Sequence, residues 1–430
     1  MVMDCLSTKD NMLYIDGVSA ADLVKEFKTP LYVYSEKTIR SAMAQFRESI
    51  NDFYNGNGMV LYASKAFSCK EMYRLAKEEN IGVDCVSGGE IYTALSAGFN
   101  PKNIVFHGNN KTYDELEFAV KENVGRIIAD NFDDLDLIAL VAKENKKTVN
   151  IQLRITPGID AHTHDFIKTG QDDSKFGFTL SNGSAFKAAE KAFNTEYINV
   201  LGLHCHIGSQ IFETLPFEEA AKVMIGFIKE IKEKLGKEIK ELNLGGGFGI
   251  KYLESDSPKK FTEFLKDVSK ILITETKAAD IALPKIFIEP GRSIVAPAGL
   301  TLYTVGNIKE IKGMHNYVSI DGGMGDNPRF ALYGAKYTVL VANKTEEPKN
   351  YTANIVGKCC ESGDIIAENV KIAKPERNDI LAVLATGAYN YSMASNYNRI
   401  PRPAAVLVND KKAKIIIKRE TYEDLVKNDI

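Results

Sequence analysis

Reactive side chains and glycines recur at the ends of apolar, β-type runs between residues 59 and 291. In chain order they are Lys65, Asp84, His107, Arg154, His204, His206, Gly245, Gly246, Gly247, Glu289 and Arg292. Strand ends are solvated, so a polar residue at any one of them is ordinary. Seven of eight runs carry such residues, however, and functional side chains of parallel barrels gather at the carboxyl ends of strands. The pattern indicates one shared site.

Lys65 and a glycine run are the first pair with a chemical meaning. Lys65, in YASKAF, is suited to a Schiff base if its amine is partly removed from water, although a solvated lysine at a strand end is the plainer reading. Gly245–Gly247, in LNLGGGFGI, allow backbone N–H groups to approach a phosphate, and late loops are the usual phosphate site of such barrels. The spacing fits neither a dinucleotide fingerprint nor a Walker loop, and a tight turn also favours glycine.

Glu289, in IEPGR, suggests how a pyridoxal-5′-phosphate (PLP) ring would be used. A carboxylate beside the pyridine nitrogen keeps that nitrogen protonated and makes the ring a strong electron sink, which suits loss of CO₂. A cationic partner would weaken the sink and suit a racemase. The alternative is a strand-end salt bridge between Glu289 and Arg292.

Two further motifs carry candidate groups. His204 and His206, in HCHIGSQ, point to one face of a strand, but without a matching third ligand we expect no metal. An imidazole stacked on a cofactor ring is the better role for His206, while His204 is packed in the barrel. KCCESGD (358–364) is either an ordinary loop or the source of a proton-delivering thiol, which needs partial exposure.

The elements that position these residues alternate between strand and helix. Eight β-type runs cover 59–64, 81–86, 103–108, 126–130, 149–155, 200–207, 241–247 and 285–291. Seven amphipathic helical stretches lie between them. This α/β pattern predicts a (β/α)₈ TIM-like barrel, with an open doubly wound sheet as the alternative.

The two ends of the sequence follow a different pattern. About 35 residues before the first barrel strand read as strand, turn and strand, and after residue 295 short β-type runs separated by turn residues replace the helices. We therefore expect a barrel over residues 36–294 and a second, mostly antiparallel β domain from residues 1–35 and 295–430.

Composition narrows the class of protein. The chain has 430 residues, a net charge of −3 and a pI of about 6.2, which argues against a nucleic-acid surface. Its six cysteines are scattered and form no C-x-x-C pair, as expected for reduced thiols. With no secretory h-region and no long apolar run, we expect a cytoplasmic protein that does not cross a membrane.

Taken together, the motifs resemble those of the fold-type-III PLP-dependent decarboxylases, and within them the diaminopimelate decarboxylase family. The resemblance extends from TPLYVY (29–34) to NRIPRPAAVLV (398–408). It is carried by YASKA, VDCVSGGE, GNNKT, LGLHCHIGSQ, LNLGGGFGI, EPGRSIVA, CESGD and TGAYNYSMASNYN. It implies PLP as cofactor and a homodimer with shared active sites.

The resemblance also implies roles for individual residues. Lys65 would form the Schiff base, His206 would stack on the ring, Glu289 would pair with the pyridine nitrogen and Tyr389 would lie near the cofactor. The residues implied for the phosphate are Ser209, Gly245, Gly246, Gly247 and Gly291. Those implied for the distal end of the substrate are Arg292, Arg329, Tyr333, Tyr389 and, from the neighbouring subunit, Glu361. Cys360 of that subunit would join Lys65 and His206 as a catalytic residue.

Two departures from the family pattern affect these assignments. The family usually has proline where this chain has Phe330, and here Pro328 precedes Arg329 instead, so a surface Pro-Arg turn is the alternative for Arg329. Cys359 doubles the motif cysteine, which we place at Cys360 because it directly precedes ESGD.

The residues implied for the distal end also bear on the substrate. Diaminopimelate ends in a second amino-acid centre, whose carboxylate suits arginine and whose ammonium suits Glu361. We therefore expect decarboxylation of meso-2,6-diaminopimelate to L-lysine and CO₂, the last step of lysine biosynthesis. The alternatives are a decarboxylase of ornithine, arginine or carboxynorspermidine, a racemase, or a non-catalytic PLP-binding protein.

Overall fold

The computed structural model describes residues 2–159 and 173–430. The chain divides into two compact units. One, here called the barrel unit, comprises Ala42–Gly249 and Ser257–Gly291. The other, here called the β unit, comprises Met1–Ser41, Ile250–Asp256 and Arg292–Ile430.

The barrel unit is a closed ring of eight parallel strands. In chain order they are β5 (Gly58–Ala63), β6 (Gly82–Cys85), β7 (Ile104–Phe106), β8 (Arg126–Ala129), β9 (Val149–Thr156), β11 (Ile198–His204), β12 (Glu241–Asn243) and β13 (Lys285–Ile288). Each pairs with the next, β13 pairs with β5, and the short strand β10 (Phe178–Thr179) adds to β9. The predicted barrel is confirmed, and the open-sheet alternative is wrong.

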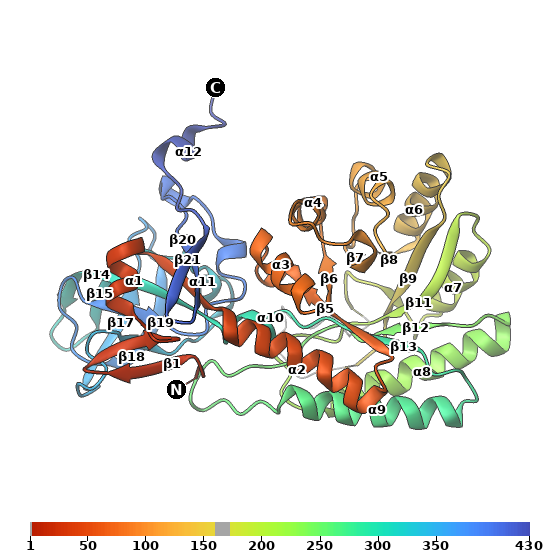
Figure 1. Ribbon diagram of the computed structural model, residues 1–430, viewed down its shortest axis with the longest axis horizontal. Coiled ribbons are helices and arrows are strands. Elements are labelled where there is room, and N and C mark those ends of the chain that lie inside the picture. The colour runs from red at the N-terminus through yellow and green to blue at the C-terminus, as the bar shows by residue number, and fades with distance from the viewer. Residues whose placement is uncertain (1, 160–172) are drawn as a thin grey trace. The chain divides into compact units, whose positions relative to one another are not determined.

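The barrel strands are buried on both faces because helices cover their outer side (Figure 1). The helices are α2 (Glu36–Tyr54), α3 (Lys70–Glu78), α4 (Gly88–Ser96), α5 (Tyr113–Lys121), α6 (Phe132–Glu144), α7 (Ser184–Phe193), α8 (Leu215–Leu235) and α9 (Phe261–Ala278), with 3₁₀ turns at Ser64–Ala66 and Pro101–Asn103. Local signals explain their ends. A capping box between Thr112 and Glu115 begins α5, and Gly236 ends α8 with a positive φ of 64°.

The barrel interior changes character along its axis. Leu61, Val105, Ile128 and Phe287 form an apolar layer. At the amino ends of the strands, Arg126 of β8 donates to both oxygens of Glu241 of β12, at 2.7 and 2.5 Å. The carboxyl ends carry the polar residues described below, as expected for a barrel that binds ligands at that end.

The β unit contains two sheets. The first joins β1 (Leu6–Lys9), β2 (Met12–Ile15) and β3 (Val18–Ser19). The second joins β4 (Leu31–Ser35), β14 (Gly299–Glu310), β15 (Asn316–Ile320), β16 (Val339–Val341), β17 (Tyr351–Val356), β18 (Ile365–Ile372), β19 (Ile380–Val383), β20 (Ala404–Asn409) and β21 (Lys412–Ile417). Apart from the parallel pairs β4–β20 and β15–β17, the pairings are antiparallel, so the predicted mostly antiparallel architecture is confirmed.

Short helices complete the β unit. They are α1 (Ala20–Phe27), α10 (Arg292–Val295), α11 (Arg329–Tyr333) and α12 (Tyr422–Val426), with 3₁₀ turns at Tyr391–Met393 and Tyr397–Arg399. The prediction missed α1, which begins where the Ser19 side chain accepts the Asp22 N–H. Across the described residues of both units, no helix has the length and apolar character needed to span a membrane.

Candidate active site

The carboxyl ends of β5 and β6 place Lys65 near two buried carboxyl groups. Lys65 lies in the 3₁₀ turn directly after β5, and its side chain is exposed. The neighbouring Ser64 hydroxyl lies 2.7 Å from both the Asp84 carbonyl and Glu90 Oε2. Burial raises the pKa of Asp84 to about 6 and also raises that of Glu90, while the positive charge of Lys65 opposes both shifts. The Lys65 amine therefore lies close enough to the Asp84 and Glu90 carboxyl groups to interact with their charges.

Glu289, just after β13, has the most elaborate set of partners in this region. Its Oε1 lies 2.8 Å from His107 Nε2 and accepts a hydrogen bond from Asn243 Nδ2 at 2.7 Å, and its Oε2 lies 3.2 Å from His204 Nε2. Burial alone would raise the pKa of the Glu289 carboxyl, but His107 and His204 outweigh burial and hold it well below its usual range. The structure therefore keeps Glu289 ionised.

The two imidazoles beside Glu289 are oriented by the barrel. Their ring centroids lie 4.8 Å apart with the planes at 70°. Burial lowers the pKa of His204 to about 4 in spite of the Glu289 charge, so His204 is neutral at pH 7 and acts as a hydrogen-bonding group. The expectation that His204 is merely packed in the barrel is thus incomplete, because its Nε2 is directed at Glu289.

His206, two residues after the last residue of β11, is fixed by the glycine loop. Its Nδ1 accepts the Gly246 N–H at 3.2 Å, which leaves the ring proton on Nε2. Burial, followed by the charges of Lys65 and Arg154, lowers the pKa of His206 well below its usual value. The ring is consequently neutral, as a flat apolar surface against a cofactor requires.

The glycine loop follows β12 and packs closely against its neighbours. A Cβ at position 246 would lie 2.2 Å from the backbone oxygen of Glu289, so no other residue fits there. The Asn243 side chain accepts the Gly245 N–H at 3.0 Å while its amide donates to Glu289. Asn243 thus links the loop to the carboxylate. Gly291 is buried in the same unit, and Ser209 is partly buried.

The β unit carries its own buried cationic cluster. Arg292 Nη1 and Arg329 Nη1 both donate to the Tyr252 hydroxyl, at 2.7 and 3.0 Å, and Arg329 Nη1 also donates to the Tyr337 hydroxyl at 2.8 Å. Burial would raise the pKa of Tyr252, but the two guanidinium groups lower it overall. The Arg292 guanidinium also lies 4.8 Å from the centre of the Tyr389 ring.

Arg329 is 8% exposed and begins α11, with Pro328 as its N-cap. The alternative that placed Arg329 on the surface in a Pro-Arg turn is therefore wrong. Proline before a helix is compatible with this geometry, because its φ of −78° already suits the first turn. Tyr333, at the end of the same helix, is exposed.

In the CESGD loop and the residue before it, one of two adjacent thiols is exposed and the other is buried. Cys360 is exposed and Cys359 is buried, with the pKa of Cys359 raised by burial to about 11. Asp364 Oδ2 accepts the Cys359 N–H at 2.7 Å, and Asn398 Oδ1 accepts the Cys360 N–H at 2.7 Å. The exposed thiol and the neighbouring exposed Glu361 are thus the groups that this loop offers to other molecules.

Comparison with known proteins identifies the family. Residues 36–296 match the family described as "Pyridoxal-dependent decarboxylase, pyridoxal binding domain". The diaminopimelate decarboxylase of Bacillus methanolicus is 49% identical over 408 residues, which cover 95% of this chain and 94% of the relative. That of Bacillus subtilis is 48% identical over 420 residues, covering 97% and 95%. The chain belongs to the diaminopimelate decarboxylase family.

Solved structures agree with the assignment to the diaminopimelate decarboxylase family. A crystal structure of diaminopimelate decarboxylase from M. jannaschii has a TM-score of 0.93 and 37% identity, and covers 99% of this chain and 98% of that one. A structure of diaminopimelate decarboxylase from M. jannaschii in complex with L-lysine has a TM-score of 0.92 at the same identity.

The donor set of the barrel unit fits the pyridoxal phosphate that this family binds. It combines an exposed lysine amine, an ionised buried carboxylate, a neutral half-buried imidazole and a glycine loop at one end of the barrel. Such groups suit the kinds of atoms that pyridoxal phosphate presents, which are an aldehyde, a pyridine nitrogen, a flat ring and a phosphate.

Several residues of these sites were not predicted. Asn243 had a weak signal, because it lies two residues after Glu241 and therefore on the same inner face of β12. Tyr252 and Tyr337 had none. The structure also changes the metal argument: among the described residues, the buried group with ligand atoms within 4.8 Å of one another is His107, His204 and Glu289, not the His204–His206 pair.

Proposed function

We propose that this chain is a PLP-dependent enzyme that decarboxylates meso-2,6-diaminopimelate to L-lysine and CO₂, the last step of lysine biosynthesis. The observation that carries the proposal is the ionised Glu289, held by His107, His204 and Asn243 in a pyridoxal-binding barrel. A carboxylate in this state stabilises a protonated pyridine nitrogen. Relatives about half identical over nearly the whole chain, named for this activity, support the substrate.

In this proposal, the bound cofactor supplies an electron sink for the pair of electrons left when CO₂ departs. Lys65 would bind the cofactor covalently, and Glu289 would retain the proton at the pyridine nitrogen. His206 would lie against the ring face, where its neutral state would avoid competition with the ring for Glu289. Ser209, Gly245, Gly246, Gly247 and Gly291 would bind the phosphate, and Tyr389 would lie beside the cofactor.

The distal end of the substrate is bound in this proposal by Arg292, Arg329, Tyr333, Tyr389 and Glu361. Among the described residues, Arg329 donates its hydrogen bonds from Nη1, which leaves its Nη2 and Nε groups for a substrate carboxylate in this proposal. A guanidinium fork binds a carboxylate through two hydrogen bonds. Two buried cations would instead repel the bare cation at the end of ornithine or arginine, which favours diaminopimelate over those substrates.

The cluster of His107, His204 and Glu289 serves hydrogen bonding in this proposal, with no metal ion. A cation bound there would take the carboxylate that the pyridine nitrogen requires. We also place the protein in the cytoplasm, because all six cysteines are free thiols.

We further propose a homodimer with shared active sites, because Cys360 and Glu361 are exposed on their loop. In this arrangement Cys360 of one subunit delivers a proton in the site of the other. Mixing Lys65→Ala subunits with Cys360→Ala subunits should restore activity, since a mixed dimer contains one site with both residues. Verified subunit exchange without any recovery would contradict the shared site.

The direct experiment is incubation of the protein with PLP and meso-diaminopimelate, followed by measurement of CO₂ and lysine. Equimolar release of both products is expected. Conversion of meso-diaminopimelate to its other stereoisomers without CO₂ would indicate a racemase, and cofactor binding without turnover would indicate a non-catalytic protein. Efficient turnover of ornithine, arginine or carboxynorspermidine would leave the PLP chemistry standing and overturn the substrate.

A further inference from the structure

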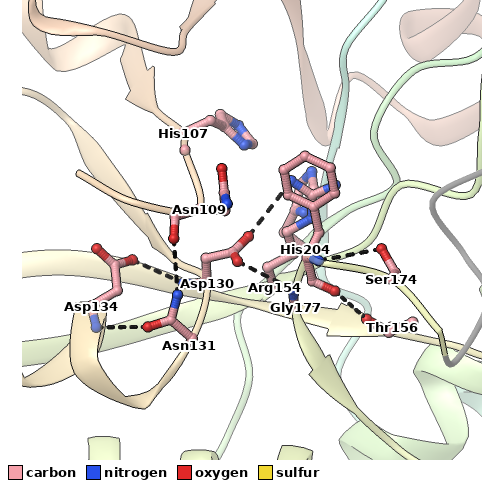
Figure 2. Close-up of polar contacts among 12 residues, drawn as sticks. His107, Asn109, Asp130, Asn131, Asp134, Arg154, Thr156, Ser174, Gly177 and His204 are labelled. Carbon is pink, nitrogen blue, oxygen red and sulfur yellow. Dashed lines mark hydrogen bonds and ion pairs between the residues drawn. The ribbon is translucent and has the colours of Figure 1, made fainter. Parts of the chain in front are cut away.

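A second buried charge pair lies at the same end of the barrel, and the mechanism above does not use it. Arg154, near the end of β9, points its guanidinium toward Asp130, which directly follows β8 (Figure 2). Arg154 Nη1 lies 3.7 Å from Asp130 Oδ1, and the side chains are 11% and 2% exposed. The guanidinium also covers the ring of Phe176, at 4.2 Å from its centroid. The pair is therefore shielded from water.

Asp130 is held in place from two sides. Its Oδ2 accepts the Gly177 N–H at 3.3 Å, and its own backbone N–H donates to Asp134 Oδ2 at 3.0 Å (Figure 2). Asp134 Oδ2 in turn accepts from the buried Lys111 Nζ at 2.7 Å. Asp134 is thus the ion-pair partner of Lys111, whereas Asp130 is the carboxylate that pairs with Arg154.

Arg154 has more than one possible anionic partner. Burial lowers the pKa of its guanidinium, and the charges of Asp130, Glu289 and Asp84 oppose that shift, in decreasing order of strength. Arg154 lies opposite His204 in the β9–β11 pairing, and His204 Nε2 lies 3.2 Å from Glu289 Oε2, which brings Arg154 into the neighbourhood of this carboxylate. The close contacts of Glu289 are nevertheless His107, His204 and Asn243. If Arg154 turned toward Glu289, a permanent cation would take the place that the proposed function gives to the pyridine nitrogen.

We propose that Asp130 is a positioning residue that holds the Arg154 guanidinium on the β8 side of the barrel and thereby keeps the Glu289 charge for the ring nitrogen of the cofactor. The proposal rests on the proposed function, because only in that function does the Glu289 charge stabilise a protonated pyridine nitrogen. It predicts that the negative charge of Asp130 matters more than its shape, and that it matters only while Arg154 carries a positive charge.

The test is Asp130→Asn in the PLP-loaded enzyme. An asparagine side chain retains an oxygen that can accept the Gly177 N–H but lacks the charge that holds Arg154. We expect kcat to fall by about tenfold or more with less than about a threefold change in KM, since the loss concerns the chemical step rather than substrate binding. The relative intensities of the visible absorption bands of the bound cofactor should change as well. Asp130→Glu, which changes the shape but keeps the charge, should retain more activity than Asp130→Asn.

Two comparisons separate this role from a structural one. In an Arg154→Gln background, adding Asp130→Asn should leave the cofactor spectrum unchanged, because the cation to be positioned is gone. As a matched control, Glu241→Gln removes a buried carboxylate that pairs with Arg126 at the amino end of the barrel, and should lower the unfolding temperature while kcat and the spectrum stay near those of the unmodified protein.

The proposal is overturned by any of three results, provided that the unmodified protein releases CO₂ from diaminopimelate. They are normal kcat and an unchanged spectrum in Asp130→Asn, the same spectral change in the Arg154→Gln background, or a larger loss in Asp130→Glu than in Asp130→Asn. An inactive unmodified protein would instead contradict the proposed function.

Discussion

Replacing Glu289 with glutamine tests the central group of the proposed mechanism. The amide has nearly the same shape, so it can still accept the Asn243 hydrogen bond that Oε1 now accepts at 2.7 Å. It carries no charge, however, and its NH₂ group must face one of the two imidazoles that now lie 2.8 and 3.2 Å from the carboxylate. A neutral amide cannot retain a proton on the pyridine nitrogen, so the electron pair left by CO₂ is poorly delocalised.

The expected loss follows from the size of one preorganised electrostatic contact. Removing such a contact from a water-excluded site costs about 10²–10³ in kcat, or roughly 2.7–4 kcal/mol. We therefore expect Glu289→Gln to lower kcat by at least about a hundredfold. KM for diaminopimelate should change little, because Glu289 is not placed in contact with the distal end of the substrate. Steady-state kinetics, with cofactor content measured by absorbance, provides both numbers.

Glu241→Gln is the matched control. Glu241 is also a buried glutamate of the barrel, but it lies at the amino end of β12, where Arg126 and Gln152 donate to it. Its replacement leaves Arg126 without a charged partner, which should lower the unfolding temperature and spare kcat. Near-normal turnover in Glu289→Gln with intact cofactor binding, or an equal loss of kcat in Glu241→Gln, would refute the reasoning.

Three further predictions concern other parts of the chain. Lys65→Ala should abolish turnover and the covalent fixation of the cofactor by borohydride, and a variant that still carries reducible PLP would disprove the assignment. Arg329→Ala should raise KM for diaminopimelate about ten- to a hundredfold, from a charged hydrogen bond of about 1.5–3 kcal/mol; steady-state kinetics that show an unchanged KM would remove Arg329 from the substrate site. Burial raises the pKa of Asp326 to about 7, above its unfolded value, so its ionisation destabilises the fold at high pH and this cost disappears as pH falls. Asp326→Asn should therefore raise the unfolding temperature more at pH 8 than at pH 5, and an equal shift at both pH values would contradict the sign.

The barrel could be predicted from the sequence because its strands are short apolar runs separated by amphipathic helices, a pattern that local spacing reveals. Lys65, His206 and Glu289 stood out for the same reason, since each lies at or just after a strand end. The β unit was predicted less completely. Helix α1 was read as a turn, and β18, with the mixed sequence IIAENVKI, was missed because only part of it is buried.

The contacts of the candidate site could not be predicted, because they join residues that are far apart in the sequence. Tyr252 meets Arg329 across 77 positions, and Asn243 meets Glu289 across 46. Such pairs follow from tertiary packing, and neither hydrophobic periodicity nor a short motif encodes them. Arg329 shows the consequence: with proline before it and none after it, a surface turn stood as the alternative to the predicted substrate-binding role, and only the fold shows that Arg329 is buried.

The two carboxyl groups next to His107 show how one end of the barrel can shift the pKa values of neighbouring carboxyl groups in opposite directions. His107 Nε2 lies 2.8 Å from Glu289 and 3.7 Å from Asp84. Burial raises the pKa of Asp84 to about 6, whereas the imidazoles hold that of Glu289 well below its usual range. Groups whose surroundings drive their pKa values apart can serve different roles in one site. As the pH falls through about 6, Asp84 takes up a proton while Glu289 keeps its charge. The charge on which the proposed decarboxylation depends is therefore a property of the whole cluster, and it is sensitive to every cation that can reach it.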